Sequence, residues 1–128
     1  MKLEHTAYPV TDPAAVAAWY VTHCGMRIIR ETGPPTWTHF LSDSAGGVIE
    51  IYNNPRVTPP TYATMDPLLL HIAFATDNVP AERARLIAAG CTEAEPIVVT
   101  PAGDTLVMLR DPWGFALQLC HRKWLMAP

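Results

Sequence analysis

The sequence has few charged residues and no block of like charge. Only 16% of its 128 residues are charged, and 9 basic residues against 12 acidic ones give a formal net charge of −3. Nucleic acids and anionic membranes are bound by concentrated basic surfaces, so this balance argues against both as partners. The hydrophobic fraction of 49% argues against a disordered chain.

The sequence also lacks a long hydrophobic run and a cysteine pattern. No apolar stretch approaches the roughly 20 residues of a membrane span, and the opening MKLEHTAYPV is typical of a strand rather than a secretion signal. Cys24, Cys91 and Cys120 are odd in number and show no C-x-x-C spacing, which indicates reduced thiols and a cytoplasmic protein. The length predicts a single domain.

The chain contains two similar halves. LEHTAYPVTD at 3–12 is echoed by LLHIAFATD at 69–77, and each ends at an Asp able to cap a helix. Helical sequence follows at 12–25 and 79–90, with Pro near each start and Gly at each end. Further strands are predicted in both halves, at 26–31, 37–44 and 46–53, and at 95–100, 104–111 and 115–121.

These elements predict an α+β fold of two tandem βαβββ modules. We expect module one at 1–53 and module two at 68–121, joined by a proline-rich linker at 54–67 and followed by a tail at 122–128. Each module offers four strands and one helix, so one face of each sheet is left without a helix.

Polar residues interrupt the apolar strands at equivalent places in the two modules. His5 and His71 lie in the first strands, and Glu50 and Gln118 lie in the last. Each alone has a plainer explanation, such as a hydrogen-bonded core His or a solvent-facing Glu, but burying them among apolar neighbours is costly unless a partner satisfies them. Their symmetry favours one shared site, where two imidazoles, a carboxylate and an amide oxygen would suit a divalent metal.

The same motifs resemble a known superfamily. LEHTAYPVTD, the Glu of GGVIEIYNN, the His of LLLHIAFATD and the terminal DPWGFALQL resemble the vicinal oxygen chelate proteins, which include glyoxalase I, extradiol dioxygenases and bleomycin resistance proteins. The resemblance spans residues 3–121 and implies a curved mixed sheet around a metal cavity, with Ni, Co, Zn, Mn or Fe as the cofactor. It places His5, Glu50, His71 and Gln118 at the ligand positions, and implies a small-molecule substrate and a homodimer.

Within this superfamily the ligand order is most similar to bacterial glyoxalase I, a lyase acting on the glutathione hemithioacetal of methylglyoxal. A ligand Glu in that enzyme moves a proton between adjacent carbons. Here Gln118 replaces the usual Glu and cannot accept a proton at neutral pH. Pro9 stands where glyoxalases commonly carry an Arg that pairs with glutathione. The resemblance therefore implies a metal-dependent lyase or isomerase with Glu50 as base, acting on another substrate with vicinal oxygens.

Other activities of the superfamily are alternatives. An extradiol dioxygenase would use His5, His71 and Glu50 around Fe(II), although such enzymes are usually about twice this length. A metal-free module of the bleomycin-resistance type would capture an antibiotic in an aromatic groove. A thiol transferase of the fosfomycin-modifying type would need a Glu where this chain has Gln118.

Substrate contacts are predicted for further residues. Tyr52 shares the strand face of Glu50, and Asn54 ends a stretch, EIYNN, similar to one that helps glyoxalase hold glutathione. His39 either hydrogen-bonds a substrate oxygen or is a solvated residue. Trp113, in the DPWG turn, either lines the mouth of the site or packs on a helix.

Overall fold

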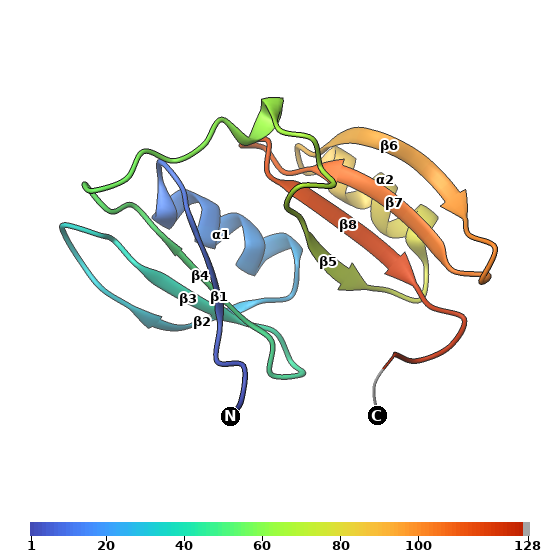
Figure 1. Cartoon of the computed structure of the whole chain (residues 1–128), viewed down its shortest axis with the longest axis horizontal. Coiled ribbons are helices and arrows are strands. Elements are labelled where there is room, and N and C mark those ends of the chain that lie inside the picture. Colours follow the sequence, from blue (N-terminus) through green and yellow to red (C-terminus); the bar gives the residue numbers. More distant parts are fainter. Residues whose placement is uncertain (127–128) are drawn as a thin grey trace. The chain divides into compact units, whose positions relative to one another are not determined.

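The structure, a computed structural model, describes residues 1–126 of the chain. The chain divides into two compact units, Met1–Pro60 and Thr61–Pro128 (Figure 1). Their boundary falls inside the proline-rich segment expected as the linker, which also holds a short 3-10 helix that the sequence pattern did not predict, η1 (Tyr62–Thr64). Among the described residues, no helix has the length and apolar character needed to cross a membrane.

Unit one has the strand, helix and three-strand order expected from the sequence. Its elements are β1 (Thr6–Pro9), α1 (Pro13–His23), β2 (Arg27–Glu31), β3 (His39–Ser42) and β4 (Val48–Tyr52). The sheet has the order β1-β4-β3-β2, with β1 parallel to β4 and the other neighbours antiparallel. Asp12 caps the N-terminus of α1, and its side chain accepts a hydrogen bond of 3.1 Å from the Ala15 N–H.

Unit two repeats this order. Its elements are β5 (Ile72–Ala75), α2 (Val79–Ala88), β6 (Thr92–Val99), β7 (Thr105–Arg110) and β8 (Ala116–His121). The sheet order is β5-β8-β7-β6, again with the first and last strands parallel. The cap of α2 is Asn78, which accepts from the Ala81 N–H at 3.0 Å, and not Asp77 as the repeat suggested. The α+β fold of two βαβββ modules is confirmed.

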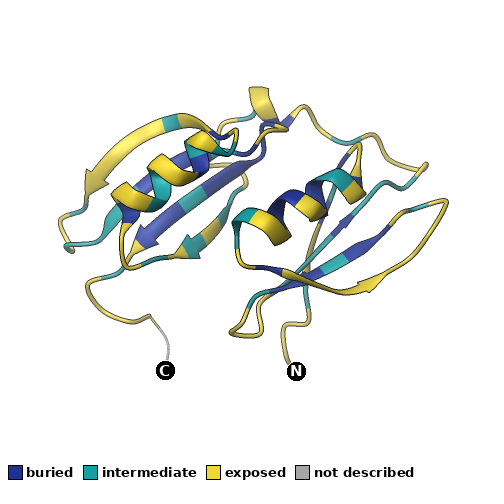
Figure 2. Cartoon of the chain, turned by 180° about the vertical axis from the view of Figure 1, so that it is seen from behind, coloured by how far each residue is buried: buried dark blue, intermediate teal, exposed yellow. Residues whose placement is uncertain are grey.

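Each helix covers one face of its own sheet, and buried residues lie along the helices and the central strands (Figure 2). In unit one, Tyr20 of α1 is buried together with Leu41 and Ile51 of the sheet. In unit two, Leu86 of α2 is buried together with Leu117. Strand side chains alternate between faces, so the residues between these core positions belong to the helix-free face of each sheet.

Candidate functional site

His5 and Glu50 meet on the helix-free face of the first sheet. His5 Nε2 lies 3.0 Å from Glu50 Oε2, and the His5 ring packs edge-on against Phe40 with ring centroids 5.4 Å apart. Phe40 and Glu50 are directly paired across β3 and β4, so their side chains share a face. Leu41 and Ile51, which alternate with them, are 0% exposed on the α1 face.

His71 and Gln118 occupy the equivalent positions in unit two. Ala73, two residues after His71, is the register partner of Gln118. In the same way Ala7, two residues after the first His, is the register partner of Glu50. Each His directly precedes its strand rather than lying inside it. The equivalence inferred from sequence spacing therefore has a structural counterpart in the register of both sheets.

Hydrogen bonds hold one ring nitrogen of each His. His71 Nδ1 lies 2.9 Å from the carbonyl oxygen of Pro67. A carbonyl oxygen only accepts, so Nδ1 carries a proton, and in the neutral ring Nε2 is the nitrogen able to bind a metal. His5 Nδ1 contacts the carboxylate of Glu4, and this hydrogen bond, aided by the charge of Glu50, raises the pKa of His5 above its ordinary value. The strand pattern did not single out Glu4, because an exposed residue beside a His carries no periodic signal.

The donor groups fit a divalent cation. Imidazole nitrogen with carboxylate or amide oxygen is a donor set of Zn, Ni, Co, Mn and Fe. Two ligand atoms that each lie about 2.1 Å from one ion, at right angles to each other, are about 3 Å apart; the His5 and Glu50 atoms are 3.0 Å apart. Across residues 1–126, no group of three or more His, Cys, Asp or Glu side chains is gathered closely enough to hold a metal. The units, each taken by itself, supply one imidazole and one oxygen donor.

Two residues near Glu50 have different surroundings. Tyr52 lies on the same sheet face as Glu50, because it is two positions further along β4. Its side chain is half-buried. Asn54 is engaged by the chain itself, because its side-chain oxygen accepts a hydrogen bond of 2.9 Å from the Arg56 N–H. This bond closes the turn after β4, which gives Asn54 a structural role.

His39 lies on the opposite face of the sheet from Glu50. It shares the α1 face with Leu41, and its Nδ1 is 2.7 Å from the carbonyl oxygen of Trp37. The residue is 7% exposed, so it is not a solvated surface His. The structure therefore does not bring His39 together with the His5–Glu50 pair.

The DPWG segment forms a turn held by its own Asp. Asp111 is buried, and its carboxylate accepts hydrogen bonds of 2.9 Å from the N–H groups of Trp113 and Phe115. Arg110 donates to the carbonyl oxygen of Tyr62 at 2.9 Å, which ties the turn to η1. Trp113 is 38% exposed on this turn. The DPWG motif thus has a structural role, because its Asp holds the backbone of the turn. An Asp that precedes Pro-x-Gly is typical of this role.

Solved structures share the fold of this chain. A solved glyoxalase family protein from Enterococcus faecalis has 24% identity and a TM-score of 0.73, over 93% of this chain and 96% of that one. The antibiotic-binding protein TnmS3 from a Streptomyces species has 21% identity and a TM-score of 0.74, over 96% and 97%. A glyoxalase I mutant from Zea mays has 21% identity and a TM-score of 0.73, over 93% of this chain and 44% of that one.

The family relationship rests on the sequence as well as on the fold. No curated protein matches the chain. The family model described as the glyoxalase/bleomycin resistance protein/dioxygenase superfamily matches residues 2–119, nearly the whole sequence, and confirms the resemblance expected from its motifs. The chain belongs to the glyoxalase/bleomycin resistance protein/dioxygenase superfamily.

Proposed function

We propose that the protein is a divalent-metal-dependent enzyme of the lyase or isomerase type that acts on a small substrate with vicinal oxygens. The observation that carries this proposal is the contact of 3.0 Å between His5 Nε2 and Glu50 Oε2 on a helix-free sheet face. It sets a ligand nitrogen beside a carboxylate able to act as a base.

His5, Glu50, His71 and Gln118 are the proposed metal ligands, with Ni, Co, Zn, Mn or Fe as the ion. The matching register of the two sheets and the orientation of the His71 ring by the Pro67 carbonyl support this set. When bound, a divalent metal polarises the two adjacent oxygens of a substrate.

Glu50 has the proton-transfer role. It would take a proton from the hydroxyl-bearing carbon beside a substrate carbonyl and return it to the carbonyl carbon, while the hydroxyl hydrogen passes to the carbonyl oxygen. The Gln118 amide cannot perform this reaction. Two neutral His ligands, one carboxylate and one amide leave a divalent ion with a net charge of about +1. That charge favours an anionic, chelating substrate, such as a 2-hydroxy or 2-keto acid.

Exchange of carbon-bound hydrogen tests this role before the product is known. The protein is incubated with each divalent metal and a panel of 2-hydroxy and 2-keto acids in D2O, and NMR follows deuterium entry beside the carbonyl. We expect enzyme-dependent exchange with at least one acid, and its loss in Glu50→Gln. Glu95→Gln, which alters an exposed carboxylate of β6, is the matched control and should keep the activity. Exchange that continues undiminished in Glu50→Gln would show that Glu50 is not the base.

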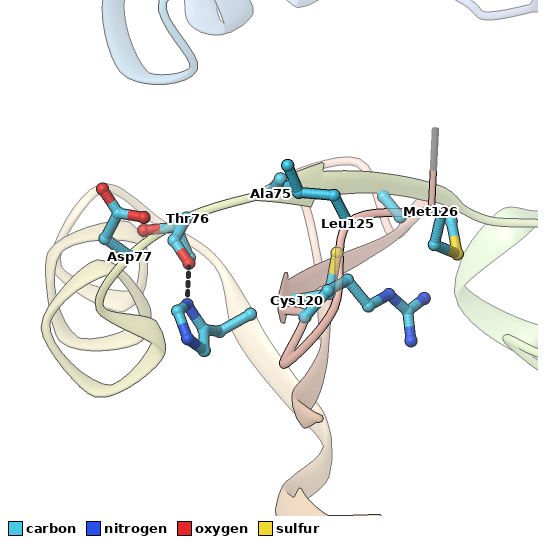
Figure 3. A pocket seen from close by; sticks show the side chains of 9 residues that line it. Ala75, Thr76, Asp77, Cys120, Leu125 and Met126 are labelled. Carbon is cyan, nitrogen blue, oxygen red and sulfur yellow. Dashed lines mark hydrogen bonds between the residues drawn. The ribbon is translucent and has the colours of Figure 1, made fainter. Parts of the chain in front are cut away.

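Metal-free capture of a small molecule is the second candidate function. TnmS3, a structural relative, is described as an antibiotic-binding protein. An apolar cavity in unit two favours this alternative (Figure 3).

An extradiol dioxygenase using His5, His71 and Glu50 around Fe(II) would instead consume oxygen with a catechol, which an oxygen electrode detects.

A further inference from the structure

Two neighbouring hollows flank the side chain of Trp37 in unit one. A cavity of about 340 Å³ has a lining of Ala14, Glu31, Thr32, Gly33, Trp37 and His39. A second cavity, of about 300 Å³, has a lining of Thr11, Asp12, Pro13, Ala14, Trp37 and Asn53. Because Ala14 and Trp37 belong to both linings, the two hollows adjoin and form one groove, which we call the Trp37 groove. It lies on the α1 side of the sheet, because it includes Ala14 of α1, and thus opposite to the face of Glu50. Small-molecule sites have volumes of roughly 300–1,000 Å³, so this groove suits a small ligand.

Trp37 forms an exposed aromatic wall that its backbone holds in place. The residue is 49% exposed, and its φ of 48° lies in the left-handed region, which bulky residues rarely adopt. Its N–H donates to the carbonyl oxygen of Gly33 at 3.0 Å, and its own carbonyl oxygen accepts from His39 Nδ1 at 2.7 Å. Strained backbone of this kind is concentrated at ligand-binding and catalytic sites. The loop between β2 and β3 therefore holds an indole ring at the surface instead of in the core.

His39 and Glu31 present two hydrogen-bond acceptors to the groove. They are register partners across β2 and β3, so their side chains share a face. Since His39 Nδ1 donates to the Trp37 carbonyl oxygen, Nε2 of the neutral ring is an acceptor. Nε2 lies 3.6 Å from Glu31 Oε2, which is longer than a hydrogen bond, and neither atom carries a hydrogen to share. His39 is buried, and a buried acceptor without a donor is costly, so this pair of acceptors suits an N–H group of a ligand.

The charges around the groove favour a cation. Glu31 and Asp12 contribute carboxylates, and no Lys or Arg is among the described residues that line the groove. Arg30, the neighbour of Glu31 in β2, pairs with Phe40 and so belongs to the helix-free face. The N-terminus of α1 carries a partial positive charge, but Asp12 caps it, so we expect the cation beside Glu31. The face of an indole ring also attracts cations.

We propose that the Trp37 groove binds a small primary ammonium ion, whose N–H groups donate to His39 Nε2 and Glu31 Oε2 and whose alkyl chain lies against Trp37. An ammonium group has three donors, which is enough for both acceptors. The lining of the groove includes none of the proposed metal ligands, so this inference does not depend on the proposed function.

The first test is an NMR titration of the full chain with n-butylammonium chloride at constant ionic strength. The backbone N–H signals of Thr32 and Gly33, which line the groove, report binding. We expect these signals to shift and saturate in the millimolar range, with the same affinity in the presence and absence of EDTA. Butan-1-ol is neutral and tetramethylammonium has no N–H group, so each should bind roughly tenfold more weakly.

Two variants assign the contacts of the ligand. Glu31→Gln removes the charge and should weaken butylammonium binding by roughly tenfold, whereas Glu95→Gln in β6 should leave it unchanged. Trp37→Asn removes the ring but keeps a residue that tolerates the left-handed region, and it should also weaken binding. Trp124→Asn, which removes an exposed indole of unit two, is its control and should not.

Long-range proton–nitrogen spectra of the imidazole rings test the role of His39. At about pH 8 we expect a proton on Nδ1 and none on Nε2, and a shift of the Nε2 signal when butylammonium binds. The proposal is overturned if the Thr32 and Gly33 signals do not saturate, or if butan-1-ol or tetramethylammonium binds as tightly as butylammonium. It is equally overturned if Glu31→Gln or Trp37→Asn keeps the wild-type affinity, if EDTA abolishes binding, or if Nε2 of His39 carries a proton in the free protein.

Discussion

Gln118 sets the charge that the proposed ligands place around a cation. In the second sheet it occupies the register position that Glu50 has in the first, yet only one of the two side chains carries a charge. A second carboxylate would lower the net charge of a bound divalent ion from about +1 to zero. A carboxylate at position 118 would therefore increase the affinity for the metal but weaken the preference for an anionic substrate. The amide of Gln118 has the opposite effect on both.

We expect negligible wild-type activity with the glutathione hemithioacetal of methylglyoxal. Gln118 cannot accept the proton, and Pro9 leaves the glutathione carboxylate without an Arg. Gln118→Glu should tighten divalent metal binding by roughly tenfold, or about 1.4 kcal/mol, in a calorimetric titration. Gln118→Leu, which adds no charge, is the control and should not tighten it. Robust wild-type turnover of the hemithioacetal that persists in Glu50→Gln would contradict both the substrate and the base assigned here.

At the scale of elements, the turn between β7 and β8 depends on a close approach at Gly114. Its φ of +89° lies in the left-handed region, and a Cβ there would come within 2.6 Å of the Ala63 Cβ in η1. Gly114→Ala should lower the free energy of unfolding by about 2–4 kcal/mol in urea denaturation. Gly33→Ala, where an added Cβ meets nothing within 4 Å, should change it by less than about 0.5 kcal/mol. Equal stability of the two variants would show that this contact is not required.

Periodicity and capping predict nearly all of these elements, because both modules alternate apolar residues and mark their helices with Pro and Gly. The exact ends of the elements are harder to predict from the sequence. One more residue separates the Asp from the helix in the second module than in the first, so the cap of α2 is Asn78. The meeting of His5 with Glu50 follows from alternation and symmetry. Alternation alone does not predict that His39 lies on the buried face of the sheet, because this depends on which face α1 packs against. The contacts of Glu4 and Pro67 with the His rings are set by local loop geometry, for which the sequence has no pattern.

At the scale of the whole molecule, we propose a homodimer. Each unit has a sheet with a helix on one face only, which leaves the other face uncovered. Uncovered sheet faces are commonly buried when identical chains associate symmetrically. Sedimentation equilibrium at micromolar concentration should give a mass near twice the 14.1 kDa of one chain. A mass near 14.1 kDa across that range would refute the dimer.

Metal content tests the central claim, that His5, Glu50, His71 and Gln118 hold a divalent ion. The protein is purified without chelator or affinity tag, and its metal is measured by inductively coupled plasma mass spectrometry. We predict about one divalent ion per chain, and a fall to background in His5→Ala plus His71→Ala with an unchanged circular dichroism spectrum. His23→Ala plus His121→Ala removes as many imidazoles outside the ligand set and should keep the metal. Wild-type metal content in the His5 and His71 double variant would contradict the assignment.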